Sequence, residues 1–197
     1  MSTSGWIVLG AVCAALVWAV WVFNALVQLR NRIANAFAQI DVQLKRRHDL
    51  VPNLVETAKR YLTHEAATLE AVIRARGQAV TATDAMRRRP TDATAARALM
   101  GAEQALDATL GRLLMVAEAY PDLKADESLR SLSEELTSTE NRVGFARQAY
   151  NDDVLAYNDA VGQFPALVVA RLCGFAPGAM LQVIESAAER EAPRVAF

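Results

Sequence analysis

Charged residues are missing from the first 29 positions, which contain no Asp, Glu, Lys or Arg. Within them, the nineteen residues 5–23 are almost wholly apolar, and nine of these are Leu, Ile, Val or Phe. A helix of that length rises about 28 Å, close to the ~30 Å hydrocarbon core of a bilayer. The absence of charge therefore predicts a transmembrane anchor over residues 1–29. Its expected lipid-facing and interfacial side chains are Trp6, Ile7, Leu9, Leu16, Trp18, Trp21 and Phe23.

Basic residues are also missing before the apolar run, since residues 1–4 contain no Lys or Arg. A cleaved signal peptide, the alternative interpretation, has a basic segment there and a shorter apolar stretch of about 7–15 residues. We therefore expect an anchor that is not removed. Five Lys or Arg residues follow between Arg30 and Arg47, and the positive-inside rule places that side in the cytoplasm with the N-terminus outside.

Cysteine and histidine are scarce, with two residues of each. Cys13 and Cys173 do not define a disulfide framework, because one lies in the predicted span. His48 and His64 are each followed by an acid, but adjacent residues on a helix do not face each other. Phosphate-binding glycine loops and nucleophile-elbow motifs are absent from the sequence. We expect no metal, cofactor, small-molecule substrate or catalytic residue. If an unrecognised enzyme site exists, His48, Asp49 and His64 are the first places to look.

A basic excess is absent too, because the formal net charge is −1. Nucleic-acid binding is therefore not expected. One cluster, Arg87–Arg89, stands before Pro90. We interpret it as a solvated helix end, where cations are favourable. The alternative is a contact for anionic lipid or RNA.

Proline is infrequent, and no useful strand-like alternation interrupts the long stretches with helical periodicity. A first apolar stripe, at gaps of three and four residues, continues the anchor without a break. It comprises Leu26, Leu29, Ile33, Phe37, Ile40 and Leu44. Asp49 suits a helix cap and Pro52 disfavours helix at the preceding residue, so a second helix is predicted over about 52–80. A third is predicted over about 91–120, and a fourth from 126 or 128 to just before Pro165. The expected class is all-α: an N-terminal transmembrane helix continuing into an antiparallel up-and-down four-helix bundle.

Three segments give the chain a resemblance to a known family. They are IDVQLKRRHDLVPNLVET (40–57), STENRVGFARQAYND (138–152) and the YN…FP ending (157–165). The chain resembles the LemA family of bacterial membrane-anchored helical proteins over most of residues 24–175. The resemblance implies long bundled helices behind a transmembrane segment in the bacterial inner membrane, and no established enzymatic activity. The chain departs from the lipoprotein-type members at Val12, which is bulky for the position before Cys13.

Tyr150–Asn151 and Tyr157–Asn158 repeat at a spacing of seven, which places both pairs on one helical face. We interpret them as aromatic core with polar side chains that set the helix register. The alternative is a stripe that binds a partner, since Tyr suits interfaces. Mid-helix charges at Glu140 and Arg142 are expected to pair with a neighbouring helix.

The segment 164–184 has a single charge, Arg171, and ends before a polar tail at 185–197. Because the fourth helix of such a bundle returns toward the bilayer, its end is delivered to the membrane surface or to a neighbouring subunit. The expected contact residues are Phe164, Leu167, Val168, Arg171, Leu172 and Phe175. The alternative is that this segment covers the bundle's own open end.

These features predict a non-enzymatic scaffold or adaptor whose cytoplasmic bundle spans residues 30–163. Its expected partners are membrane lipid and a second copy of itself or another membrane protein. Two alternatives remain open: a regulatory subunit of a membrane protease or transporter, and an enzyme with an unrecognised site.

Overall fold

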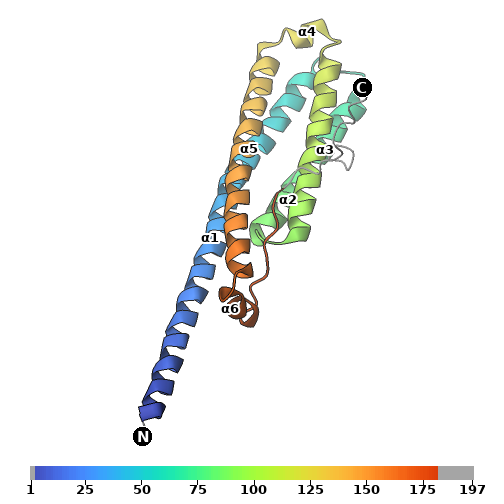
Figure 1. The fold of residues 1–197 in the computed structure, drawn as a ribbon. Coiled ribbons are helices and arrows are strands. Elements are labelled where there is room, and N and C mark those ends of the chain that lie inside the picture. Colours follow the sequence, from blue (N-terminus) through green and yellow to red (C-terminus); the bar gives the residue numbers. More distant parts are fainter. Residues whose placement is uncertain (1–2, 182–197) are drawn as a thin grey trace, which may run out of the picture.

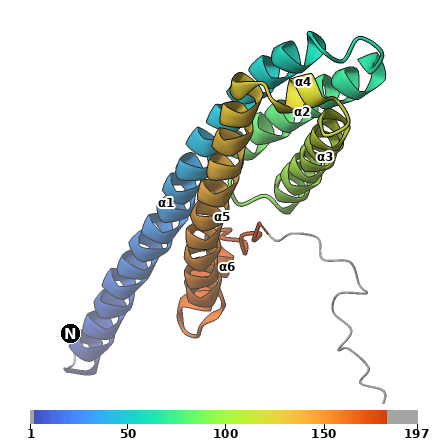
Figure 2. The ribbon, with the colours of Figure 1, turned by 90° about the horizontal axis from the view of Figure 1, so that it is seen from above.

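The computed structural model describes residues 3–181 and is all-helical over that range (Figure 1). Its helices are α1 (Thr3–Lys59), α2 (Ala66–Arg88), α3 (Ala93–Ala117), α4 (Pro121–Lys124), α5 (Glu127–Gly162) and α6 (Ala166–Leu172). α1 packs along α5, α2 packs along α3, and α1 also packs on α2 (Figures 1 and 2). The predicted all-α class with an N-terminal apolar helix is confirmed.

The first part of α1 projects beyond the other helices (Figure 1). Within the described residues, α1 is the one helix long and apolar enough to cross a membrane, and only 6% of its most apolar window is buried. Exposure changes abruptly at the end of this run: Trp21 is 68% exposed and Val22 is 4% exposed. The packed domain therefore begins directly where the apolar run ends.

The predicted helix boundary at Asp49 and Pro52 is wrong, because α1 continues through Pro52 to Lys59. Proline has no N–H, so the carbonyl of His48, four residues earlier, loses its helical partner. The guanidinium Nε of Arg76 in α2 donates to that carbonyl at 2.6 Å. A neighbouring helix thus supplies the missing bond. The break falls instead at residues 60–65, and the predicted helix 52–80 is divided between α1 and α2.

The other predicted helices are confirmed with small boundary shifts. Asp92 caps α3 by accepting from the N–H of Ala95 at 2.7 Å. Asp126 caps α5 by accepting from Ser128 and Leu129 at 2.8 and 3.1 Å. These bonds satisfy backbone donors that a helix start leaves free. They hold the pKa of Asp126 below its usual value; the Leu129 N–H contributes most, and the Tyr61 hydroxyl bond comes next.

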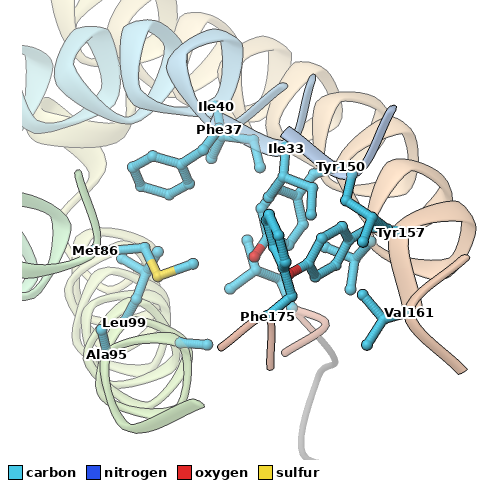
Figure 3. Packing of buried hydrophobic residues seen from close by; sticks show 14 of the residues in the cluster. Ile33, Phe37, Ile40, Met86, Ala95, Leu99, Tyr150, Tyr157, Val161 and Phe175 are labelled. Carbon is cyan, nitrogen blue, oxygen red and sulfur yellow. The ribbon is translucent and has the colours of Figure 1, made fainter. Parts of the chain in front are cut away.

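The buried apolar residues form two clusters along the molecule. The anchor-side core lies nearer the apolar end of α1 and contains Phe37, Met86, Leu99, Tyr150 and Tyr157 among others (Figure 3). The distal core is aliphatic, built mostly from Leu, Val and Ala of α1, α2 and α3, with Leu129 and Leu136 of α5. Polar residues described below separate the two cores.

Candidate functional site

The short helix α6 lies beside α1 and α5 at the end of the domain nearest the apolar run (Figure 1). Val169 and Ala170 face inward and are buried. Phe164 and Leu172 are each 83% exposed, and Val168 is also exposed. α6 therefore presents large apolar side chains outward at the level where the packed domain begins.

The remaining predicted contact residues of this segment divide between the surface and the interior. Leu167 is half-buried and Arg171 is exposed. Phe175 is buried: its ring packs edge-on against Phe23 with centroids 5.5 Å apart. The guanidinium of Arg30 lies over the same ring, 5.5 Å from its centroid. Phe175 thus holds the segment that follows α6 against α1, immediately after the apolar run.

After α6 the chain turns at Gly174, whose φ of +73° is favourable only for glycine, and continues without helix. We call residues 173–181 the strap. It runs back along α5 toward the middle of the domain (Figures 1 and 2). The amide of Ala179 donates to the carbonyl of Thr91, just before α3, at 3.2 Å. The strap therefore links α5 to the start of α3.

The two Tyr–Asn pairs hold the strap by its main chain. The Asn151 side chain both donates to the carbonyl of Leu181 and accepts from its N–H, at 3.1 and 2.8 Å. Asn158 makes the same two bonds with Gly178, at 3.0 and 2.7 Å. A spacing of seven residues on α5 thus matches a spacing of three residues in the strap. Each Asn side chain thus offers one donor and one acceptor to a strap residue, as the main chain of a neighbouring β-strand would.

The two tyrosine hydroxyls also donate hydrogen bonds to main-chain carbonyls. Tyr150 donates to the carbonyls of Pro90 and Ala179, at 2.6 and 2.9 Å, while Tyr157 donates to Ala176 at 3.0 Å. Both rings lie in the anchor-side core (Figure 3). Burial raises the pKa of both hydroxyls, and the charge of Arg30 opposes the rise at Tyr157. Within the described chain, the face formed by these pairs is occupied by the protein's own C-terminal segment.

A buried charged network crosses the domain between the two cores, and we call it the polar layer. Glu103 of α3 accepts from Arg47 Nη1 at 3.1 Å and lies 2.7 Å from His48 Nε2. A second nitrogen of Arg47 donates to Asp107. Arg47, His48 and Glu103 are all buried, whereas Asp107 is exposed. Arg47 Nε is itself buried without a hydrogen-bond partner in the described structure.

Sequence reasoning missed the polar layer, although a signal for it exists. Arg47 and His48 occupy core positions of α1 between Leu44 and Val51. Glu103 does the same in α3, between buried leucines at 99 and 106. A charged residue at the spacing of a core position is a recognisable pattern, because the helix must bury it against something of opposite charge. The two other candidates near His48, Asp49 and His64, are exposed and do not join the network.

A cleft of about 570 Å³ opens between α3 and α5 beside the polar layer. Arg47, Glu103 and Asp107 form part of its wall, with Glu140 and Arg147 on the α5 side. Phe145 also lines it and is 75% exposed. The cleft combines buried charge with an exposed aromatic ring, which is a chemistry suited to recognising another polypeptide.

The charges of α5 pair differently from the expectation. Arg46 of α1 donates to Glu135 of α5, with Nε 3.0 Å from Oε1. Glu140 lines the cleft instead of bridging to a helix. In the segment 3–181, no group of three His, Cys, Asp or Glu side chains is placed to hold a metal ion.

Comparison with known proteins agrees with the sequence segments noted above. The family model described as LemA family matches residues 36–197. The magnetosome protein MamQ of Magnetospirillum gryphiswaldense is 30% identical over 84 residues, covering 43% of this chain and 31% of MamQ. Magnetosome protein MamQ 2 of Paramagnetospirillum magneticum is 30% identical over 79 residues, covering 40% and 29%. The match thus spans less than a third of these relatives' length. With most of its length matched by the family model, the chain belongs to the LemA family.

Proposed function

We propose that this protein is a single-pass membrane scaffold without enzymatic activity, anchored by the apolar start of α1 in the bacterial inner membrane. One observation carries the proposal: a single unbroken helix supplies both the exposed apolar run and the spine of the packed domain. Burial begins at Val22, one residue after exposed Trp21. With no linker between them, the domain's orientation is tied to that of the anchor.

The length of α1 beyond the apolar run supports a scaffolding role. Residues 22–59 of a continuous helix rise about 57 Å. α5 packs along this part of α1 and stiffens it. The distal end is therefore held at a fixed height above the bilayer, which serves to position partners. The orientation proposed is the one favoured by the positive charges after the span, with the helical domain in the cytoplasm.

Self-association is proposed to involve α6. Its exposed side chains Val168 and Leu172, with Phe164 just before the helix, lie beside the start of the packed domain, so copies anchored in one membrane present them at the same height. A second candidate function is an adaptor or regulatory subunit for another membrane protein. The cleft between α3 and α5 favours this alternative, because it is open and carries the exposed Phe145.

The chemistry of the cleft supports the non-enzymatic proposal. Both carboxylate oxygens of Glu103 are already engaged by Arg47 and His48. Among the described residues that line the cleft, none is Ser, Thr or Cys. The network accordingly has the character of a structural ion pair.

Topology provides the first test. A reporter active only in the cytoplasm, fused after Phe197, is expected to be active, and alkaline carbonate is expected to leave the protein in the membrane fraction. A reporter active only outside the cytoplasm serves as the matched fusion. Activity of that second fusion would contradict the orientation, and release by carbonate would contradict the anchor.

Oligomerisation provides the second test. Light scattering of the full-length protein in detergent is expected to give one discrete homo-oligomer. The double variant F164S/L172S is expected to lower the molar mass, while F145S, which removes another largely exposed ring from the cleft, is expected to leave it unchanged. A monomeric wild-type protein would contradict self-association and favour the adaptor.

A further inference from the structure

Three arginines from different segments converge on a second cavity, of about 580 Å³, on the anchor side of the domain. Arg30 belongs to α1, Arg88 ends α2, and Arg89 follows it. Within residues 3–181 no carboxylate lies within ion-pair distance of any of the three. The neighbouring Arg87, by contrast, is paired with Asp41 and Asp84 at 2.7 Å each. We call this cavity the arginine pocket.

The protein holds one of these cations in place through an aromatic contact. The Arg30 guanidinium lies over the ring of Phe175, which the strap brings to α1. Cation–π contact orients a guanidinium without neutralising its charge. Tyr157 and residues 174–177 of the strap form the rest of that wall. The hydrogen bonds that the Tyr–Asn pairs make to the strap therefore also position this wall of the pocket.

The charge balance of the pocket favours an anion. Its lining contains three arginines and one acid, Asp92, which leaves two formal positive charges. The carboxylate of Asp92 is engaged by the N–H of Ala95 as the cap of α3. The 25-residue α3 begins at Ala93 in the same wall, so the positive end of its dipole adds to the field.

The height of the pocket fits the polar surface of a bilayer. Arg30 follows Phe23 by seven residues on α1, a rise of about 10 Å. The headgroup layer adds roughly 5–8 Å beyond the hydrocarbon core, and arginine side chains extend along the surface to reach it. A phosphate at that level lies within reach of the pocket if the apolar run spans the membrane as proposed above.

We propose that the arginine pocket binds the phosphate of an anionic phospholipid headgroup. Guanidinium groups bind phosphate oxygens through paired, charge-assisted hydrogen bonds, and three of them around one cavity suit a phosphodiester. This inference rests on the proposed anchoring only for the source of the phosphate. The pocket's preference for the phosphate group follows from its own charge and geometry.

The test measures the rise in thermal unfolding midpoint of the full-length protein in detergent as phosphatidylglycerol is added. Binding to the folded state raises the midpoint with ligand concentration, which yields an apparent affinity. The variant R88Q/R89Q is expected to lose affinity by roughly tenfold or more, the effect of losing charge-assisted bonds. The control R112Q/R142Q removes two exposed arginines outside the pocket and is expected to match the wild-type protein.

Phosphatidylcholine and inorganic phosphate form the comparison arms. Phosphatidylcholine is expected to have little effect, and inorganic phosphate to act far more weakly than phosphatidylglycerol. Equal losses in R88Q/R89Q and R112Q/R142Q would overturn the site, because only overall charge would then matter. An equal response to inorganic phosphate would overturn the lipid source. Release of the wild-type protein by carbonate would contradict the anchor instead, so the two failures are distinguishable.

Discussion

The anchor-side core and the distal core are built on different principles. The distal core is aliphatic and comes almost entirely from helices, at the three- and four-residue spacing of an ordinary helical stripe, with Leu62 added from the link between α1 and α2. The anchor-side core includes buried Tyr150 and Tyr157, whose hydroxyls bind carbonyls of non-helical chain. One end of the domain therefore depends on side-chain packing, while the other also depends on specific hydrogen bonds to main-chain groups.

Between the two cores, the polar layer is the most sensitive place to break the molecule. The variant R47M leaves Glu103 and His48 buried without the guanidinium, and removing one partner of a buried ion pair costs about 3–5 kcal/mol. Urea unfolding of the full-length protein in detergent is expected to show that loss. The double variant R47M/E103M removes both charges and is expected to recover much of it. Equal instability of both variants would contradict an ion-pair origin.

The anchor-side core is tested by removing one hydroxyl. In Y150F, the carbonyls of Pro90 and Ala179 lose a shared donor, and a buried group left unsatisfied costs about 1–3 kcal/mol. Urea unfolding is expected to show this loss, together with greater protease sensitivity of the strap. L110A, in the distal core, serves as the comparison: it lowers stability by cavity formation and is expected to leave the strap protected. Strap cleavage that rises equally in both variants would contradict the prediction.

The join between α1 and α2 is tested by a double-mutant cycle. R76M leaves the His48 carbonyl without a donor and is expected to cost about 1–3 kcal/mol of unfolding free energy. In a P52A background, the backbone N–H that the substitution restores is available to that carbonyl, so R76M is expected to cost much less. Additive effects in the cycle would show that Arg76 does not substitute for the bond that Pro52 removes.

Alkaline pH tests the burial of Tyr150 in the anchor-side core. Burial raises the pKa of Tyr150 above its ordinary value near 10. Above that value the unfolded chain releases a proton that the folded chain retains, so the folded state is stabilised below pH 10 and loses stability as the pH rises beyond it. Unfolding free energy measured between pH 8 and about 11 is expected to fall, and less steeply in Y150F. An unchanged slope in Y150F would contradict burial of the phenol.

The smallest effect is expected at the surface. Arg46 and Glu135 join α1 to α5 through an exposed ion pair, with side chains 53% and 37% accessible. Exposed pairs contribute about 0–1 kcal/mol. E135Q is therefore expected to change unfolding free energy by less than that amount, and to change it less still at high salt. A loss comparable to R47M would overturn the contrast between buried and exposed charge.

The sequence predicts most of the helical framework because apolar stripes and helix caps are local signals. Asp92 and Asp126 sit where short polar side chains satisfy backbone donors, and the helices begin beside them. Pro52 misled the prediction because its effect depends on Arg76, 24 residues later. A local pattern does not report which distant side chain supplies a missing hydrogen bond.

For the candidate sites as well, the sequence indicates the local features but not the distant groups that they contact. The spacing of Tyr150 and Tyr157 correctly places both side chains on one face of α5, but the group they bind lies in the strap. Arg30 and Arg88 are visible as charges in the sequence, yet their convergence depends on the turn between α2 and α3. Part of the predicted segment 164–184 and all of the tail 185–197 lie outside the described residues, which end at position 181.

The strap also has a consequence for the order in which the protein matures. The distal core requires the chain only as far as Leu136, whereas the anchor-side core includes Leu181. Ribosomes add roughly 5–20 residues per second, so these 45 residues take about 2–9 seconds to make. During that interval the part of α1 next to its apolar run has an incomplete core, while the distal core already has all of its residues. The end of the domain beside the apolar run is thus the last part to complete its core.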